Sequence, residues 1–168
     1  MNKFPLRLIL DDLRSAGNVG SILRTADACD VELIYACGYT PYPETSHDIR
    51  PPHVSSSNQR NIAKTALGAE TQVPVEHYSN TLEAIRQARS EGFKIIVIEQ
   101  SEKALKLYQY QPPNAPIALV LGNEVDGVPE AHLAAADAVV ELPMLGRKES
   151  LNVAVAAAIA LYHVRFAS

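Results

Sequence analysis

Three polar, glycine-containing segments of the chain carry the residue types that could do chemistry. They span residues 15–25, 121–127 and 142–152, and each follows a segment that we expect to be a strand. Ligands of parallel α/β sheets bind outside the carboxyl ends of the strands. The three segments are therefore the candidates for a ligand site.

The three segments contain no complete nucleotide-phosphate or hydrolase motif. Gly17-Asn18-Val19-Gly20 lacks the spaced glycines of the dinucleotide fingerprint, and Val128-Pro129 stands where a P-loop needs Lys and Ser or Thr. No nucleophile elbow is present, no pattern supports a cysteine nucleophile, and no His/Cys cluster has zinc spacing. We therefore expect no metal site.

The elements that must position these segments alternate between strands and helices. Strands are expected at residues 6–10, 31–36, 74–78, 94–99, 116–121 and 138–142. Helices are expected at residues 18–29, 58–67 (capped by Ser55 or Ser56), 81–92, 129–136 and 150–166, with helical turns at 103–108 and a long loop at 38–55. Strands that are apolar on both faces and separated by helices indicate an α/β fold, with a mainly parallel sheet of about six strands and helices on both faces.

Length and composition agree with one globular domain over residues 1–168. Of 168 residues, 47% are hydrophobic and 20% are charged, which excludes wholesale disorder. The longest apolar stretch, residues 153–162, is too short to span a bilayer, and no signal peptide is recognisable, so we expect a cytoplasmic protein. Cys29 and Cys37 are expected to be reduced packing residues. The net charge of -4 argues against a general nucleic-acid coat protein.

The final expected helix has no polar face over residues 151–161. A helix that is apolar all round needs cover on every side. In a domain of this size the sheet covers one side, and a second copy of the chain is the simplest cover for the other. We therefore predict a homodimer.

Motifs in the three segments resemble those of the SpoU family. They are Asn18-x-Gly20-x-x-x-Arg24, Leu121-Gly122-Asn123-Glu124-x-x-Gly127 and Leu142-Pro143-Met144-x-Gly146-x-x-x-Ser150-Leu151-Asn152-Val153, in family order along nearly the whole chain. The family comprises S-adenosylmethionine-dependent RNA ribose 2′-O-methyltransferases of the SPOUT, or α/β-knot, superfamily. The resemblance implies a C-terminal deep trefoil knot, a bent S-adenosylmethionine held by the knot loops, and a dimer with the site near its interface.

The resemblance also implies which residues bind the cofactor. Gly122 and Gly146 would let the backbone approach S-adenosylmethionine, since a Cβ would block it. The loop backbones would bind the adenine edge, and apolar side chains would contact the adenosine and methionine parts. Taken singly, each glycine could equally serve a turn, and Met144 and Leu151 could be core residues. The expected cofactor-binding residues are Leu121, Gly122, Asn123, Leu142, Pro143, Met144, Gly146 and Leu151.

Five polar residues are expected to be catalytic by the same resemblance: Asn18, Arg24, Glu124, Ser150 and Asn152. Arg24 either acts as the base that takes the 2′-hydroxyl proton or stays charged and stabilises the developing oxyanion. The second role suits a guanidinium, whose pKa lies above about 12. Glu124 could position Arg24 or the RNA, or cap a turn. Ser150 is a natural cap of the final helix, Asn18 could cap the first helix, and Asn152 is expected inside the final helix.

RNA would be held by basic residues near the motifs and in the basic stretch of residues 47–64. They could equally lie on an ordinary solvated surface, and Tyr39 and Tyr42 could stack on bases. No separate RNA-binding domain is recognisable, so the dimer surface or an accessory protein would select the substrate, with tRNA preferred over rRNA. The candidates are Arg14, Arg50, Arg60, Lys64 and Arg147 with Lys148.

Three alternatives remain open. A module of the same fold could bind cofactor or RNA without catalysis, although Arg24, Glu124 and Asn152 are all present. An enzyme of the superfamily could act on a base, although the first and third motifs favour the ribose. An unrelated flavodoxin-like nucleotide binder is disfavoured because the chain lacks complete phosphate-binding motifs.

Overall fold

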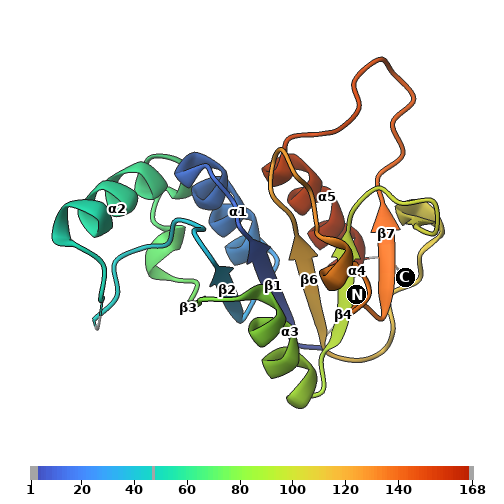
Figure 1. Ribbon diagram of the computed structural model, residues 1–168, viewed down its shortest axis with the longest axis horizontal. Coiled ribbons are helices and arrows are strands. Elements are labelled where there is room, and N and C mark those ends of the chain that lie inside the picture. Colours follow the sequence, from blue (N-terminus) through green and yellow to red (C-terminus); the bar gives the residue numbers. More distant parts are fainter. Residues whose placement is uncertain (1–3, 47, 167–168) are drawn as a thin grey trace.

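The computed structural model describes residues 4–46 and 48–166 and shows an α/β fold (Figure 1). Its sheet is parallel throughout, with strand order β3-β2-β1-β6-β4-β7-β5. The elements in chain order are β1 (Leu6–Asp11), α1 (Ala16–Ala28), β2 (Leu33–Cys37), α2 (Pro52–Ala66), the 3₁₀ turn η1 (Ala69–Thr71), β3 (Val75–Tyr78), α3 (Thr81–Ser90), β4 (Lys94–Ile98), β5 (Leu105–Lys106), the 3₁₀ turn η2 (Leu107–Gln109), β6 (Ile117–Leu121), α4 (Glu130–Leu133), β7 (Ala138–Glu141) and α5 (Val153–Phe166).

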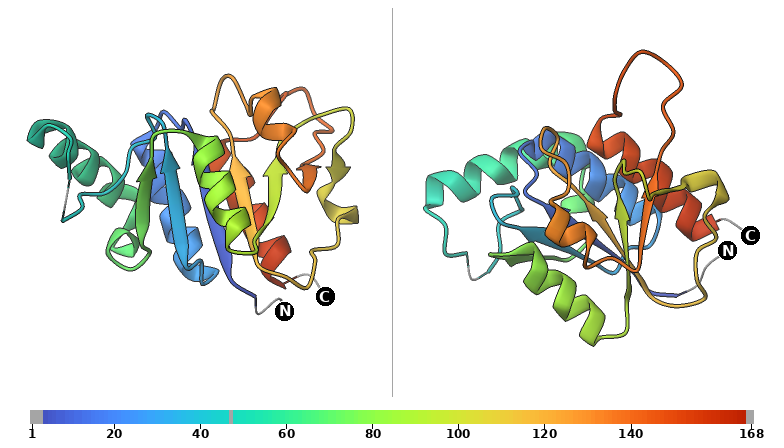
Figure 2. Two further views of the ribbon diagram at one scale, coloured as in Figure 1. Left: turned by 60° about the horizontal axis from the view of Figure 1, so that its bottom comes forward. Right: turned by 45° about the vertical axis from the view of Figure 1, so that its right-hand side comes forward.

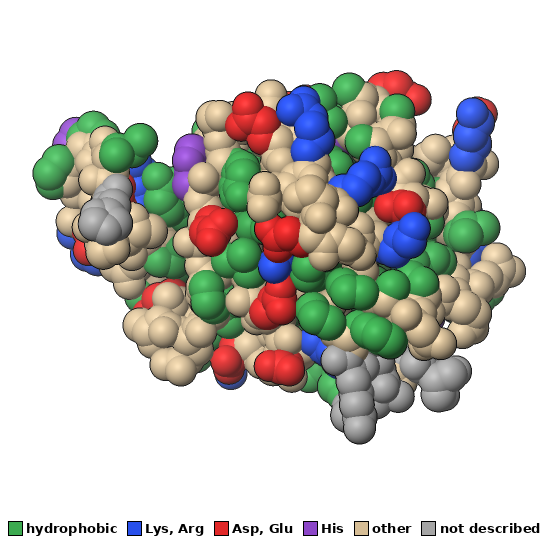
Figure 3. All heavy atoms as spheres, turned by 90° about the horizontal axis from the view of Figure 1, so that it is seen from below, with side chains coloured by type: hydrophobic (Ala, Val, Ile, Leu, Met, Phe, Trp, Pro, Cys, Tyr) green, Lys and Arg blue, Asp and Glu red, His purple; other side chains and the backbone are tan. Residues whose placement is uncertain are grey.

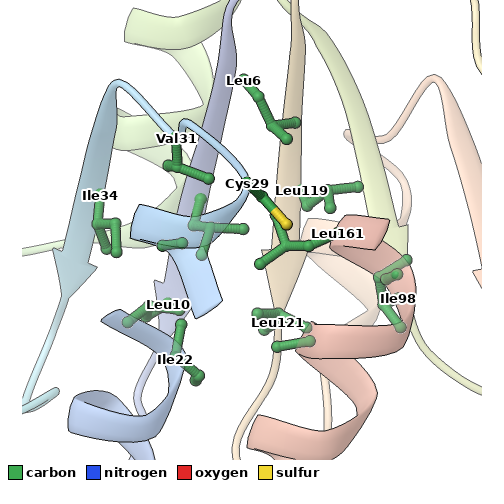
Figure 4. Close-up of a cluster of buried hydrophobic side chains, with 14 of the residues drawn as sticks. Leu6, Leu10, Ile22, Cys29, Val31, Ile34, Ile98, Leu119, Leu121 and Leu161 are labelled. Carbon is green, nitrogen blue, oxygen red and sulfur yellow. The ribbon is translucent and has the colours of Figure 1, made fainter. Parts of the chain in front are cut away.

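The helices cover both faces of the sheet, as predicted (Figure 2). On one face α1 and α5 pack against the central strands, and Leu161 of α5 lies among Leu119, Leu121 and Ile98 (Figure 4). On the other face α3 and α4 cover a second core that includes Ile85. Because both faces are buried, the strands are apolar on both sides.

Several elements differ from the sequence prediction, and four of these differences bear on the site or the sheet. A seventh strand, β5, pairs with β7 where a helical turn was expected, and only η2 keeps the helical form. Helix α2 begins at Pro52 rather than residue 58, and its cap is Pro51 instead of Ser55 or Ser56. Helix α1 begins at Ala16 with Ser15 as its cap. Helix α5 begins at Val153, so Ser150 lies outside it.

Both cysteines are buried and free, as predicted. Burial raises the pKa of the Cys37 thiol to about 12. Over the described residues, none of the helices combines the length and apolar character that a membrane crossing requires.

Candidate active site

A cavity of about 510 Å³ opens where β4, β6 and β7 end. Figure 1 shows the loops after β6 and β7 rising from this edge of the sheet, with α5 beginning beside them. The second and third predicted segments therefore meet at one site. The cavity is lined by Ile98, Glu99, Gln100, Leu121, Gly122, Asn123, Glu124, Val125, Gly127, Leu142, Met144, Lys148, Glu149, Ser150, Leu151, Asn152, Val153 and Ala156.

A chain of hydrogen bonds joins one residue from each of the three motifs. Asn152 Nδ2 donates to Asn18 Oδ1 at 3.1 Å, and Asn18 Nδ2 donates to Glu124 Oε1 at 2.8 Å. Asn18 lies in the first turn of α1, Glu124 follows β6, and Asn152 precedes α5. Two of the three line the cavity, so the network forms part of its rim.

Glu124 also fixes the start of α1. Its carboxylate accepts the backbone N–H groups of Arg14 at 2.8 Å and Ser15 at 3.1 Å. Partial burial opposes ionisation, but these bonds and the Asn18 amide outweigh it and lower the pKa of Glu124. Glu124 is therefore a fixed negative group at neutral pH.

Asn123 holds the loop after β6 rather than pointing freely at a ligand. Its Oδ1 accepts the N–H groups of Val125 at 2.8 Å and Asp126 at 3.0 Å, which closes a tight turn. Its Nδ2 donates to the Asp12 carbonyl and to the Tyr39 hydroxyl, both at 2.7 Å. All polar atoms of this buried side chain are engaged within the protein.

The two glycines expected to face the cofactor lie in different surroundings. A Cβ on Gly122 would lie 2.5 Å from Val128 Cγ2 and 2.7 Å from the Gly127 carbonyl carbon. Position 122 therefore requires glycine because the protein's own loop, at Gly127 and Val128, occupies the space that a Cβ would need. A Cβ on Gly146 would meet nothing within 4 Å, so only the second glycine faces open space.

Asn152, and not Ser150, caps the final helix. Asn152 Oδ1 accepts the N–H of Ala154 at 2.9 Å, and its carbonyl accepts the N–H of Ala156. Asn152 is exposed at the cavity rim, so the expectation of an amide inside the helix was wrong. Asn18 is likewise not a helix cap, because Ser15 Oγ accepts its backbone N–H.

Most of the predicted cofactor residues line the cavity, but Pro143 and Gly146 do not. Sequence reasoning missed the wall contributed by Ile98, Glu99 and Gln100. Glu99 Oε2 accepts the N–H of Val128 at 2.9 Å and so braces the loop after β6. The sequence could have indicated this wall, because residues 98–100 stand at the carboxyl end of a buried strand and ligands bind at such ends.

Arg24 does not line the cavity. It is exposed on α1, and the described part of the chain supplies it with no hydrogen bond or ion pair. At a rise of about 1.5 Å per residue it lies about 9 Å along the helix from Asn18. The structure therefore does not bring Arg24 to the network of its own chain.

The basic residues proposed to bind RNA divide into two groups. Arg50 is committed to its own loop: it pairs with Asp48, donates to the carbonyls of Tyr42 and Pro43, and lies 3.4 Å from the Tyr42 ring centroid. The Tyr42 ring also stacks on His77 and is 6% exposed, so neither Arg50 nor Tyr42 is free for RNA. The candidates that remain exposed are Arg14, Arg60, Lys64, Arg147 and Lys148.

Comparison with known proteins identifies relatives over nearly the whole chain. The chain is 33% identical over 161 residues to the 23S rRNA (guanosine-2'-O-)-methyltransferase RlmB of Neisseria meningitidis, covering 96% of this chain and 58% of that protein. It is 32% identical over 158 residues to the 23S rRNA methyltransferase RlmP of Bacillus subtilis, covering 94% of this chain and 57% of that protein. The chain thus spans about three-fifths of the length of the curated relatives it matches.

Solved structures give the same result. The AdoMet-bound rRNA methyltransferase of Sinorhizobium meliloti superimposes with a TM-score of 0.79 at 28% identity, over 96% of this chain and 56% of that one. The TrmH/SpoU tRNA modifying enzyme of A. aeolicus gives 0.77 at 25% identity, over 98% and 75%. The model of the SpoU rRNA Methylase family matches residues 5–162. The chain therefore belongs to the SpoU rRNA methylase family.

Proposed function

We propose that this chain transfers a methyl group from S-adenosylmethionine to a ribose 2′-hydroxyl of RNA. The observation that carries the proposal is the hydrogen-bonded network of Asn152, Asn18 and Glu124 at the rim of the cavity. Its members come from three separate motifs, and the names of the relatives RlmB and RlmP describe 2′-O-methyltransferases.

The cavity suits the proposed cofactor. A volume of about 510 Å³ lies within the range of about 300–1,000 Å³ that is typical of small-molecule sites. Leu142, Met144 and Leu151 supply apolar surface for adenosine and the methionine chain. When bound, S-adenosylmethionine supplies a methyl group on a positively charged sulfur, which is a good leaving group. The backbone of the loops after β6 and β7 supplies polar groups around it.

The polar rim would hold the ribose for the reaction. Held there, the 2′-hydroxyl oxygen would bond to the methyl carbon while the sulfur keeps the electron pair of the broken carbon–sulfur bond, and the hydroxyl proton would leave to water. Asn18 and Asn152 orient each other, and ionised Glu124 fixes Asn18, so the rim is organised before RNA arrives. Arg24 stays charged and stabilises the developing oxyanion.

The position of Arg24 favours a shared site in a dimer. Helices α1 and α5 pack side by side on one face of the sheet. The outward side of α5 carries Val155, Ile159, Tyr162 and Phe166, which are 41–51% exposed. A second copy that covers this apolar stripe brings its own α1 to the same interface. We propose that Arg24 of one copy serves the cavity of the other.

RNA would bind at the cavity edge and along α2. Residues 49–69 contain no Asp or Glu, and Arg60 and Lys64 are exposed one turn apart on α2. Acidic side chains are spread over the middle of the opposite face, at the amino ends of the strands (Figure 3). We propose tRNA as the first substrate to test and rRNA as the second, in the cytoplasm, with an accessory protein if neither is accepted alone.

The deciding experiment is a methyl-transfer assay on unmodified RNA. Purified protein is incubated with methyl-labelled S-adenosylmethionine and separate unmodified tRNA and rRNA fractions. We expect the label in 2′-O-methylribose after nuclease digestion. Label in a base would show a base-directed enzyme, and bound cofactor without label in either fraction would contradict catalysis by the isolated chain.

Mixing two inactive variants tests the shared site. We expect Arg24→Ala and Asn152→Ala each to abolish most transfer. If Arg24 acts on the partner's cavity, random exchange of subunits leaves about a quarter of the sites intact. Recovery to about a quarter of wild-type activity supports the shared site. No recovery despite verified subunit exchange contradicts it.

A further inference from the structure

Tyr39 is an exposed aromatic residue whose side chain is fixed at its far end. It is 60% exposed, yet its hydroxyl accepts a 2.7 Å hydrogen bond from Asn123 Nδ2. Its backbone N–H donates to Asp12 Oδ1 at 3.0 Å. Ordering a side chain costs conformational entropy, which burial normally offsets. Packing therefore does not explain why this ring is held in place.

The backbone on both sides of Tyr39 is fixed as well. Gly38 has a φ of +59°, and a Cβ there would lie 1.9 Å from Asp12 Oδ1. Thr40 is 2% exposed, and its Oγ1 bonds to the Leu10 carbonyl and the Leu13 N–H. The ring is therefore a rigid exposed surface rather than a mobile loop side chain.

This surface lies next to the proposed active site. Asn123, which holds the hydroxyl of Tyr39, lines the cavity and precedes Glu124. The same Asn123 amide also bonds to the carbonyl of Asp12, two residues before Arg14. Tyr42, the other tyrosine of this loop, is buried, and its ring is packed against Arg50 and His77. Tyr39 alone of these two tyrosines offers an open ring.

The charges around Tyr39 favour a nucleobase over a phosphate. Desolvation, followed by the negative charges of Asp12 and Asp126, raises the pKa of Tyr39, and Glu124 contributes in the same direction against Arg14. The phenol is therefore neutral at physiological pH. Three carboxylates would repel a phosphate at the hydroxyl end, whereas the uncharged face of a base meets no such penalty.

We propose that Tyr39 stacks on an unpaired nucleobase beside the ribose that is methylated. This inference rests on the proposed function and narrows its substrate to single-stranded or looped RNA. Bases in a duplex are already stacked and are not available to a protein ring. Stacking on an aromatic side chain typically changes RNA affinity by about 5- to 160-fold.

The chain contains no tryptophan, so Tyr39→Trp places a single reporter on the proposed surface. Its emission is followed while an unmodified tRNA transcript, a 20-nucleotide single-stranded RNA or the same RNA as a duplex is added. We expect quenching by the first two and not by the duplex. Tyr108→Trp is the matched control, because Tyr108 is 67% exposed in η2, near the opposite edge of the sheet, and should not respond.

Binding of end-labelled RNA by anisotropy separates this inference from the proposed function. Tyr39→Ala should weaken RNA binding about tenfold, and Tyr39→Phe, which keeps the ring, by less than about threefold. Both should bind S-adenosylmethionine like the wild type. RNA binding by Tyr39→Trp without any change in emission, or by Tyr39→Ala with wild-type affinity, overturns the stacking role alone. Failure of the wild type to bind any RNA overturns both proposals.

Discussion

The two loops that enclose the cavity are built in opposite ways. Residues 122–128, after β6, form a wall rich in internal hydrogen bonds, closed by the Asn123 side chain and braced by Glu99. Residues 142–152, after β7, form a wall that rises away from the body in Figure 1. In this second wall Leu145 is 99% exposed. Hydrogen bonds join the wall to the body from Gln100 Nε2 to the Glu149 carbonyl, at 2.5 Å, and from Asn152 Nδ2 to Asn18 Oδ1, at 3.1 Å.

The difference shows that similar motif residues serve different purposes. The first wall is complete without a ligand, because its glycine and asparagine satisfy contacts of the protein itself. The second wall leaves Leu145 and Gly146 in open space, so its tip is held by few contacts of the protein itself. Ligand binding should therefore change the second wall far more than the first.

A matched pair of glycine substitutions gives the largest expected difference between the walls. Gly122→Ala forces a Cβ into Val128 and Gly127 and should lower the free energy of unfolding by about 1–3 kcal/mol. Gly146→Ala meets no atom within 4 Å and should leave stability nearly unchanged. Urea unfolding of both variants measures this. Equal losses would show that the walls do not differ in rigidity.

Replacing the carboxylate that anchors the first wall should have a smaller, pH-dependent effect. Glu124→Gln loses charge-assisted bonds and should cost about 1–2 kcal/mol at pH 7. The pKa of Glu124 is lowered in the folded state, so its stabilisation is present above its unfolded pKa and is lost as the pH falls through the folded value. Urea unfolding at pH 7 and pH 3 should show the gap between wild type and variant closing in acid. A constant gap would contradict the role of the charge.

Limited proteolysis should distinguish the walls without a mutation. Trypsin should cut first after Arg147 or Lys148, which are both exposed in the second wall. If S-adenosylmethionine orders this wall, a concentration ten times its Kd should slow cleavage about tenfold. Mass spectrometry identifies the cut site. Unchanged cleavage by a cofactor-saturated protein would show that the second wall stays open.

The smallest expected effect is at the tip of the second wall. Leu145→Ser should change the free energy of unfolding by less than about 0.5 kcal/mol, because the side chain contacts almost nothing. Titration calorimetry then shows whether it contributes to cofactor binding. Weaker binding at constant stability would mean that Leu145 folds inward over the ligand.

The strands could be predicted well because both faces of the sheet are buried. Continuous apolar runs such as Ile95–Ile98 and Ile117–Leu121 have no other explanation in a chain of this size. The two-residue strand β5 could not be predicted, since Leu105 and Lys106 are defined as a strand only by their pairing with β7.

The first residue of each helix was harder to predict, because several nearby residues could act as the cap. Ser55 looked like the cap of α2, but its hydroxyl bonds to the Pro52 carbonyl inside the first turn. Proline is favoured at the start of a helix, so Pro52 was the better signal. Ser150 was predicted to cap α5, and only the bond from the Ala154 N–H to Asn152 Oδ1 shows that Asn152 is the cap.

The candidate site was predicted as three motifs but not as a network. Asn18 and Asn152 are 134 positions apart, and no spacing rule connects them. Their contact follows from the strand order, which places β6 beside β1 and α5 beside α1. The separation of Arg24 from the cavity also depends on this tertiary arrangement, whereas the pairing of Arg50 with Asp48 is local to one loop.

Arg165 fastens the last helix to the beginning of the chain. Its buried guanidinium donates to the carbonyls of Phe4 at 3.0 Å and of Cys29 and Asp30 at 2.8 Å. Both ends of the described chain therefore lie close together, at the end of α5 away from the cavity. A circularly permuted chain, with these ends joined by a short linker and new ends opened elsewhere, should keep the fold. A protein fused at the C-terminal end would instead need a linker of at least about six extended residues, at about 3.3 Å each, to run back along the roughly 20 Å of the 14-residue α5 to the cavity edge.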